Sequence, residues 1–431
     1  MTRPDAGYGR PARLWRALDR ARPPLPRFRS PLRGPWLTSL LGLVLLVGLP
    51  IVVVTGLLDR VAYGAAPIPA DVGFLQLPPF DWPTSPAWLF RLTQGTHVLL
   101  GLVLVPIVLA KLWSVAPKLV VWPPARSVTD ALERATVLLL VGSILFEVVT
   151  GVLNIQYDYV FGFGFYAAHY VGAWVFTGAL VAHVVLKLPL MVRGLRSRSL
   201  RAELRTPTSG SEDDPDSDLV ATDPRPATIS RRGALALIGG GSLLVAGLSV
   251  GQVLDGPLRG TALLLPRGRT TAAADGGPND FPVNRTFVAS GIDPAATGSA
   301  WRLELSGAGA VRLDRAALAA LAQHTVALPI ACVEGWSTEQ SWTGVRLRDL
   351  AALAGVPEPV AAVVGSIEQG PFARAELHAG QVLHPDSLLA LRVNGADLSP
   401  DHGFPARVVV PALPGVRCTK WVRTIEFRSV R

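Results

Sequence analysis

Three of the seven histidines in the chain lie inside long apolar runs: His97, His169 and His183. An ionisable side chain is costly in such a run, and one that is retained there usually serves a function. A neutral imidazole ligates metal ions, haem iron among them, and it also serves as a buried hydrogen-bonding group. The histidines therefore leave two alternatives: a metal-binding pair, or polar contacts inside a helix bundle.

A second group of chemically capable residues surrounds Cys332, one of the two cysteines of the chain. The segment HTVALPIACVEGW is typical of a strand that enters a turn at Cys332, next to Glu334 and Trp336. A thiolate at a strand end is a soft metal ligand. The alternatives are an inert buried thiol and a disulfide with Cys418, which would remove the thiolate.

Long apolar runs in the sequence predict the helices that position the three histidines. The chain has 431 residues, of which 49% are hydrophobic and 17% are charged, below the about 25% of ordinary soluble proteins. Five runs reach the about 20 residues that cross a bilayer: 37–58, 93–115, 131–153, 166–188 and 233–252. We therefore expect an N-terminal all-α transmembrane bundle of four helices and a fifth anchor helix. Two cysteines exclude a disulfide scaffold and a cysteine-rich iron–sulfur protein.

Positive charges flank the apolar runs, and this arrangement predicts the topology. Residues 1–36 and the start of 191–229 are rich in arginine, so we expect both on the cytoplasmic side. The remainder of 191–229 is polar and acidic, which predicts a disordered linker. The fifth helix then carries residues 262–431 to the extracytoplasmic side. The net charge of +9 thus indicates a multi-pass protein of the cytoplasmic membrane in contact with lipid, with no nucleic acid as a partner.

Depth along the predicted helices separates the three histidines. His97 and His169 both lie near the outer ends of their helices and so share one level. His183 lies 14 residues after His169 (183 − 169), about 21 Å deeper at 1.5 Å per residue. The predicted helices offer His183 no histidine partner at that level. We therefore expect one haem near the outer face, held by His97 and His169, and whether His183 ligates a second haem stays open.

Residues 37–190 resemble the bacterial four-helix b-type cytochromes that oxidise or reduce quinone. The resemblance rests on TQGTHVLLG and AAHYVGAWVFTGALVAHVVLKL, which contain the three histidines. It implies haem b, with His97 and His169 on the iron, and a quinone or quinol as the electron partner. The chain departs from that family in its first helix, which lacks the usual histidine.

Residues 230–255 open with Ser230-Arg231-Arg232-Gly233-Ala234-Leu235 and resemble a twin-arginine export signal kept as a transmembrane helix. That route exports folded domains, as a domain loaded with its cofactor in the cytoplasm requires. The alternative is that the two arginines are ordinary positive flanks of a membrane helix.

The last 170 residues have a different character, because charged residues return and the apolar runs shorten. Their periodicity predicts strands at 301–307, 360–366, 388–395, 406–413 and 421–427, and helices at 313–323 and 345–355. We expect a mixed α+β domain over 262–431, large enough for its own core.

This domain resembles the sulfite oxidase family of molybdopterin enzymes in FPVNRTF (281–287), residues 331–355, NGADL (394–398) and residues 402–427. The resemblance implies a molybdenum–molybdopterin cofactor with Cys332 as the protein thiolate on molybdenum. It also implies cofactor-binding roles for Asn284, Phe287, Val288, Ser366, His402, Arg407, Cys418, Thr419 and Lys420. Without it, Arg407 and Lys420 would be interpreted as a solvated strand edge.

Two differences between this sequence and the sulfite oxidases of the family concern the choice of substrate. The Cys-Val-Glu triplet is closer to the periplasmic methionine-sulfoxide reductases of the family, which implies that Glu334 relays protons at the active site. The turn after Ser366 carries Phe372, whereas sulfite oxidases have a tyrosine near the metal.

We therefore expect an enzyme, a membrane-bound molybdopterin-dependent oxidoreductase that passes electrons between the quinone pool, haem b and molybdenum. It would transfer an oxygen atom on a small extracytoplasmic molecule, as a sulfoxide reductase does. The alternatives are a sulfite-oxidising enzyme of the same family and a cofactor-free membrane-anchored binding or sensor module. An extracytoplasmic redox partner, the direction of electron flow and the oligomeric state stay open.

Overall fold

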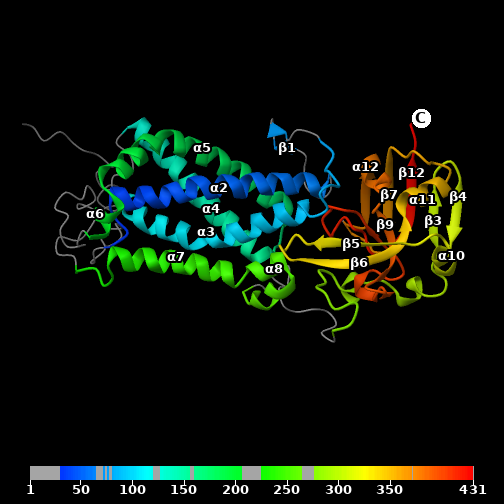
Figure 1. Cartoon of the computed structure of the whole chain (residues 1–431). Coiled ribbons are helices and arrows are strands. Elements are labelled where there is room, and N and C mark those ends of the chain that lie inside the picture. The colour runs from blue at the N-terminus through cyan, green and yellow to red at the C-terminus, as the bar shows by residue number, and fades with distance from the viewer. Residues whose placement is uncertain are drawn as a thin grey trace, which may run out of the picture. The chain divides into compact units, whose positions relative to one another are not determined.

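The computed structural model describes residues 30–64, 71–72, 75–76, 80–119, 127–155, 160–205, 225–264, 276–370 and 372–430 (Figure 1). Its first half is helical: α2 (Pro35–Tyr63), α3 (Leu89–Leu119), α4 (Val128–Asn154), α5 (Phe165–Ser197), α6 (Leu200–Arg205), α7 (Arg231–Gly247) and α8 (Val250–Leu254). Within the described residues, five helical stretches are long and apolar enough to cross a membrane. The five predicted apolar helices are thus confirmed in number and place.

The helices differ from their predicted bounds mainly at their ends. The fourth continues to Ser197, and α6 follows it, so the start of 191–229 is helical. The predicted helix over 230–255 is divided into α7 and α8, and α8 is followed by the 3-10 helix η2 (Gly256–Thr261). Most of the basic segment 1–36 and the acidic part of the linker lie outside the described residues.

The chain divides into two compact units that do not coincide with the helical and sheet regions. One comprises Met1–Leu46, Pro106–Gly142 and Gly178–Gly240, and the other comprises Val47–Val105, Ser143–Thr177 and Gly241–Arg431. In the first unit Arg231 pairs with Glu203 at 2.7 Å, and Lys187 pairs with Glu133. The second unit contains both His97 and His169 together with the whole sheet domain. The chemically interesting residues, except His183, therefore belong to one compact unit.

Two five-stranded sheets form the C-terminal domain. One contains β5 (His324–Ala331), β6 (Ser337–Arg346), β9 (Leu388–Val393) and β10 (Ala396–Asp397) in the order β10-β9-β6-β5, with β11 (Arg407–Val409) also paired to β9. The other has the order β4-β3-β12-β7-β8, from β3 (Leu303–Ser306), β4 (Ala310–Leu313), β7 (Ala361–Ser366), β8 (Arg374–His378) and β12 (Val422–Arg428). Strand β12 pairs parallel to β3, while the other pairs are antiparallel. With the short helices α9 (Phe287–Ser290), α10 (Arg315–Ala320), α11 (Leu347–Leu353) and α12 (Ala379–Leu383), these sheets confirm the predicted mixed domain.

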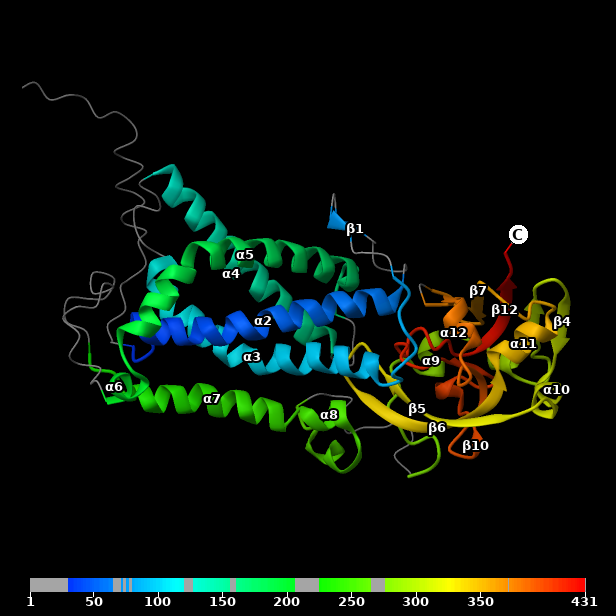
Figure 2. The ribbon, with the colours of Figure 1, turned by 45° about the horizontal axis from the view of Figure 1, so that its top comes forward.

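Strand β6 is the clearest element that the sequence pattern did not predict. It forms a long hairpin with β5 (Figure 2), in register from Ala331 opposite Ser337 to His324 opposite Gly344. Its sequence STEQSWTGVR is mostly polar, so no apolar alternation marked it as a strand. The hairpin matters for the site, because the turn between its two strands contains Cys332.

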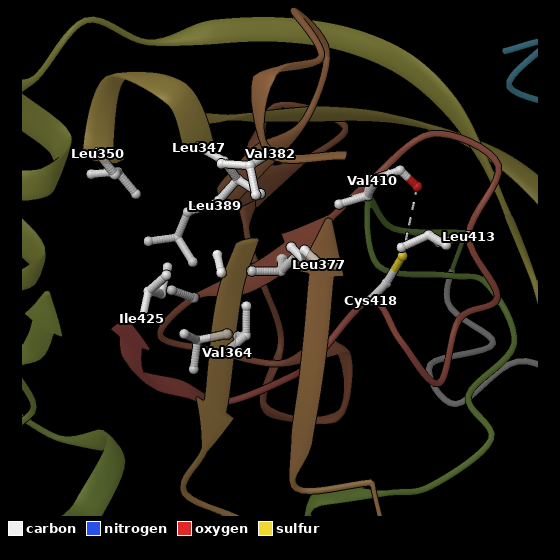
Figure 3. Close-up of a cluster of buried hydrophobic side chains, with 14 of the residues drawn as sticks. Leu347, Leu350, Val364, Leu377, Val382, Leu389, Val410, Leu413, Cys418 and Ile425 are labelled. Atoms are coloured by element: carbon white, nitrogen blue, oxygen red, sulfur yellow. Dashed lines mark hydrogen bonds between the residues drawn. The ribbon is translucent and has the colours of Figure 1, made fainter. Parts of the chain in front are cut away.

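A buried apolar cluster joins the second sheet to the first sheet and to the short helices α11 and α12 (Figure 3). Leu350, Leu377 and Leu389 are fully buried in it, and Val364 and Ile425 come from the central strands. Each such side chain contributes about 1.5–3 kcal/mol by leaving water. The strand ends that carry the candidate site are thereby held on a rigid base.

Candidate active site

The turn after β5 holds Cys332 in place through its backbone. The amide of Cys332 donates to the carbonyl of Trp336 at 2.9 Å, and the amide of Gly335 donates to the carbonyl of Cys332 at 3.0 Å. Gly335 has a φ of +88°, a conformation that favours glycine. Cys332 is 1% exposed, and neither it nor Cys418 is in a disulfide, which excludes the disulfide alternative.

Glu334 is buried beside Cys332 and fixed by its own turn. Its carboxylate accepts a hydrogen bond from Trp336 Nε1 at 2.7 Å, and its backbone carbonyl accepts one from Gln252 Nε2 at 2.8 Å. A carboxylate that shares a turn with a metal-ligating thiol can hold or move a proton next to that metal.

Arg407 supplies a buried positive charge in the same neighbourhood. Its Nε donates to the carbonyl of Cys418 at 3.2 Å, its Nη1 donates to the carbonyl of His402, and its guanidinium lies 5.5 Å from the Trp342 ring centre. Burial lowers the pKa of Arg407 to about 10, so the group remains charged at neutral pH, and the Cys332 thiolate would favour that charge. Among the described residues no carboxylate forms an ion pair with Arg407, which leaves its charge for an anion from outside.

Lys420 is the second cation of the site. Its ammonium donates to the carbonyls of Arg285 and Asp401 and lies 4.4 Å from the Trp421 ring centre. Burial, together with the nearby charge of Arg407, lowers the pKa of Lys420 to about 7. A bound anion would restore the charged form, because an opposite charge favours it.

Two further predicted residues shape the same corner. His402 is buried, contacts the carbonyl of Asn279 through Nε2 at 2.9 Å and stacks on Phe281 with ring centres 3.6 Å apart. Burial and Arg407 lower its pKa to about 3, so this imidazole is neutral. Ser366 donates to the carbonyl of Lys420 at 2.8 Å. Both therefore order the loops around the cations.

An orphaned polar atom indicates that this corner fits a bound group. Thr419 is 3% exposed, and its hydroxyl oxygen has no hydrogen-bond partner within the described part of the chain. A buried hydroxyl without a partner is costly, so a ligand that hydrogen-bonds it is favoured. In sequence, Thr419 lies between Cys418, whose carbonyl accepts a hydrogen bond from Arg407, and Lys420. Two cations and an orphaned hydroxyl fit the phosphate end of a pyranopterin.

The remaining predicted cofactor residues differ in how exposed they are and in what they contact. The side chain of Cys418 points into the apolar cluster, with its sulfur 3.9 Å from the carbonyl of Val410 (Figure 3), and burial raises the pKa of this thiol. Val288 is 88% exposed in the short helix α9, whereas Phe287 is half-buried near Trp421. Asn284 is half-buried and accepts from the amide of Arg285. Among these residues, only the backbone of Cys418 takes part in holding Arg407.

The helical segments of the same unit bring His97 and His169 together. Their ring centres are 6.2 Å apart, with the rings at 84°. The Nδ1 of His97 donates to the carbonyl of Val52 at 2.9 Å. The Nδ1 of His169 lies 3.1 Å from the hydroxyl of Thr150 and 3.0 Å from Glu147. In both rings the Nδ1 atom is thus engaged, and the Nε2 atom is the one left for a ligand bond.

Several residues of these sites were not found from the sequence. Glu147 was overlooked because one carboxylate in an apolar helix carries no motif, although its rarity there was a usable signal. Gly56 was overlooked too, and a side chain on it would approach His97 Cε1 to 2.7 Å. Tyr166 of α5 lies against Phe372 with ring centres 5.9 Å apart, which no pattern in the sequence indicated.

Comparisons with known proteins find matches for the sequence of the sheet domain. The sequence model of one family, described as oxidoreductase molybdopterin binding domain, matches residues 290–431. An uncharacterized oxidoreductase of Bacillus subtilis, YuiH, is 42% identical over 99 residues, which are 23% of this chain and 49% of that protein. Sulfite oxidase of Arabidopsis thaliana is 37% identical over 20% of this chain and 25% of its own length. Sulfite oxidase of Gallus gallus is 32% identical over 31% of this chain and 36% of its own length.

The chain thus spans half or less of the length of these relatives, and the matches concern the sheet domain. They agree with the site geometry, in which a strand-end thiol, two cations and an orphaned hydroxyl gather at one corner. Residues 290–431 are therefore similar to the molybdopterin-binding domain of oxidoreductases, the sulfite oxidases among them.

Proposed function

We propose that the chain is a membrane-bound oxidoreductase that passes electrons between a quinone pool, a haem b held by His97 and His169, and a molybdenum centre held by Cys332. Its reaction is oxygen-atom transfer on a small extracytoplasmic molecule, with sulfoxide reduction as the first candidate. The observation that carries this proposal is that the paired histidines and the Cys332 turn belong to the same compact unit.

His97 and His169 would hold the haem iron through their Nε2 atoms. Their ring centres lie 6.2 Å apart, close enough for both imidazoles to contact one bound group. Ligating histidines commonly donate their other nitrogen to a carbonyl or carboxylate, as Val52 and Glu147 accept here. Haem, when bound, supplies one-electron redox chemistry.

The residues of the sheet domain would divide the work at the molybdenum centre. Cys332 would supply the thiolate, and Arg407, Thr419 and Lys420 would bind the phosphate end of the pterin. Glu334 would hold a proton near the reacting atoms. Molybdenum, when bound, supplies the two-electron oxygen-atom transfer, while the protein positions the cofactor and tunes it.

The membrane location supports the quinone as the electron partner. In support, five helices of the described residues are long and apolar enough to cross a membrane, and quinones are lipid-soluble. We propose that residues 262–431 lie on the extracytoplasmic side, and that the segment from Arg231 directs their export by the twin-arginine route. An alkaline phosphatase fusion at the C-terminus, active only outside the cytoplasm, checks the sidedness.

The test of the reaction follows the haem spectrum in the detergent-purified full chain. The protein is reduced with a limited amount of dithionite and mixed with methionine sulfoxide. We expect the reduced haem bands to disappear in the wild type and to persist in Cys332→Ser. No haem bands at all, or their oxidation at equal rates in both proteins, contradicts the proposal. Haem-free and molybdenum-free protein would favour the binding or sensor module.

Sulfite oxidation is the second candidate, and one contact favours it. The ring of Tyr166 lies 5.9 Å from that of Phe372, so α5 brings a tyrosine to the turn where the sequence of the sheet domain has none. Relatives in the comparison are named sulfite oxidases. Sulfite added to the oxidised protein would then reduce the haem, and Tyr166→Phe would slow that reduction. Reduction of the haem by sulfite, with no oxidation by sulfoxides, selects this candidate.

A further inference from the structure

We propose that Gln94 is the positioning residue that couples the two redox sites: it fixes the Cys332 turn to the helix that carries His97 and provides the bonded path for electrons between them. This inference rests on the proposed function, because it requires a haem at His97 and molybdenum at Cys332. All the residues that carry it belong to the second compact unit.

The first observation is a direct hydrogen bond from α3 to the turn. Gln94 Nε2 donates to the carbonyl of Val333 at 2.6 Å, and Val333 is the residue after Cys332. Gln94 is 5% exposed, so this bond is shielded from water. The amide is also held at its other end, because Tyr63 Oη donates to Gln94 Oε1 at 3.4 Å. The side chain therefore has one orientation, with its donor directed at the turn.

A second, independent observation is the close approach of the turn to the same helix. A Cβ atom on Gly335 would lie 2.8 Å from Val98 Cγ1 and 2.9 Å from Val98 Cβ. Glycine at this position thus allows the backbone of the turn to touch α3. Gln94 and Val98 are one turn apart on the helix and share a face. His97 lies between them in sequence, one turn after Gln94.

The path through Gln94 is short and mostly covalent. It runs from Cys332 along one peptide to the carbonyl of Val333, across the hydrogen bond to Gln94, and through one helical turn to His97. Each electron that moves along this path leaves the site at one end, at Cys332 or at His97, and is added to the site at the other end. Two passages balance the two electrons of one oxygen-atom transfer, with quinol as the reductant when a sulfoxide is the oxidant.

The same turn offers a matched control. Gln252 Nε2 donates to the carbonyl of Glu334 at 2.8 Å, and Gln252 is 1% exposed. It lies in α8, whose sequence VGQVL contains no histidine. The two glutamines therefore make equivalent buried bonds to neighbouring carbonyls of one turn. Gln94 lies on the helix of His97 itself, whereas Gln252 reaches that helix only by a longer route, through the bonds of Arg91 to the carbonyls that follow Gln252. A role limited to holding the turn predicts the same effect for both.

The experiment compares Gln94→Met with Gln252→Met, since methionine keeps the volume and removes the amide. Two readouts do not depend on activity: the haem and molybdenum contents, and hydrogen exchange of residues 332–336 in protein prepared without the molybdenum cofactor. The third is the rate of haem oxidation after rapid mixing of reduced protein with methionine sulfoxide, and of haem reduction with sulfite.

We expect both variants to keep their cofactors and to show faster hydrogen exchange in the turn. Only Gln94→Met should slow the oxidation of the haem by methionine sulfoxide, or its reduction by sulfite, by several-fold. The reduction potential of the haem should stay unchanged. Equal slowing in both variants, or no slowing in Gln94→Met, overturns the coupling role while leaving the proposed function in place. If the wild type shows no haem change with either compound, the proposed function fails and the coupling role falls with it.

Discussion

The two candidate redox sites are built in different ways. In the sheet domain, Arg407 and Lys420 are held by backbone carbonyls, and Cys332 by the amides of its own turn. In the helices, His97 is also held by a backbone carbonyl, that of Val52, but His169 depends on the side chains of Glu147 and Thr150 from a neighbouring helix. A site held by the backbone tolerates changes around it, whereas a site held by side chains depends on each of them. The predictions below use that difference, from the largest expected effect to the smallest.

Replacing Cys332 should have the largest effect. Cys332→Ser removes the soft thiolate, and we expect molybdenum-dependent turnover to fall by more than the about 10–100-fold that loss of an outer-shell partner costs. Cys418→Ala is the comparison: both thiols are buried among apolar side chains, but the Cys418 sulfur lies next to the carbonyl of Val410. It should cost about 1 kcal/mol of stability and keep the molybdenum. Metal analysis and the melting temperature of both variants check this, and equal loss of molybdenum would contradict the assignment.

The histidine pair should be nearly as sensitive. His169→Ala removes one of the two proposed ligands, and we expect the absorption bands of the haem to disappear from the purified protein. His183→Ala changes a histidine in the same helix α5 but in the other compact unit, and should keep them. Loss of the bands in His183→Ala, with retention in His169→Ala, would show that the pair has been assigned wrongly.

Glu147 tests whether the helical site depends on its supporting side chains. Its carboxylate lies 3.0 Å from His169 Nδ1, and we expect Glu147→Leu to weaken haem retention by about 10–100-fold. Glu133→Leu, which removes a carboxylate from the same helix α4, should leave it unchanged. Haem transfer to apomyoglobin measures retention in each protein. Identical transfer rates would mean that Glu147 does not support the ligand.

Lys420 gives the sheet domain a pH dependence. Burial lowers its pKa from 10.5 to about 7, while Arg407, Glu368 and Asp401 contribute charges nearby. Between these two pH values the unfolded chain binds more protons than the folded one, so stability rises with pH across this window. Because the side chain is partly exposed, we expect a rise on the order of 1–2 kcal/mol in cofactor-free protein.

Urea unfolding near neutral pH and near pH 9 measures this change, and Lys420→Met should abolish it. A stability that falls with pH across the same window in the wild type, or an unchanged slope in Lys420→Met, would rule out the buried ammonium as its cause.

Val288 should give the smallest effect. Its side chain is 88% exposed, so Val288→Ala should change stability by less than about 0.5 kcal/mol and leave the molybdenum content as in the wild type. Phe287→Ala, beside it, removes a half-buried ring near Trp421 and should cost more. A loss of molybdenum in Val288→Ala would instead support the predicted contact between Val288 and the cofactor.

The sequence carries more local information about the sheet domain and its candidate site than about the helical one. Cys332, Arg407 and Lys420 lie in short sequence motifs whose order is typical of a family. The residues next to them in the chain were therefore enough to suggest their roles. His97 and His169 are distant in sequence, and only their similar depth in two apolar runs brought them together. Their supports, Val52 and Glu147, required the packing of the helices, which no periodicity of one helix specifies.

Strand β6 was not predicted because its sequence is mostly polar and shows no apolar alternation. Cys418 stays a predicted cofactor residue, and the structure adds that its side chain faces the core while its carbonyl accepts a hydrogen bond from Arg407. A sequence motif identifies a position, and it does not separate the two sides of a strand there.

The central claim is that one chain holds both cofactors, and it is tested most directly by their content in the detergent-purified full-length protein. Elemental analysis gives molybdenum per chain, and the pyridine haemochrome spectrum gives haem b per chain. The account predicts about one of each. Molybdenum without haem would reduce the helices to a membrane anchor, and haem without molybdenum would leave a cytochrome whose sheet domain has lost its catalytic cofactor. Either result would contradict the account.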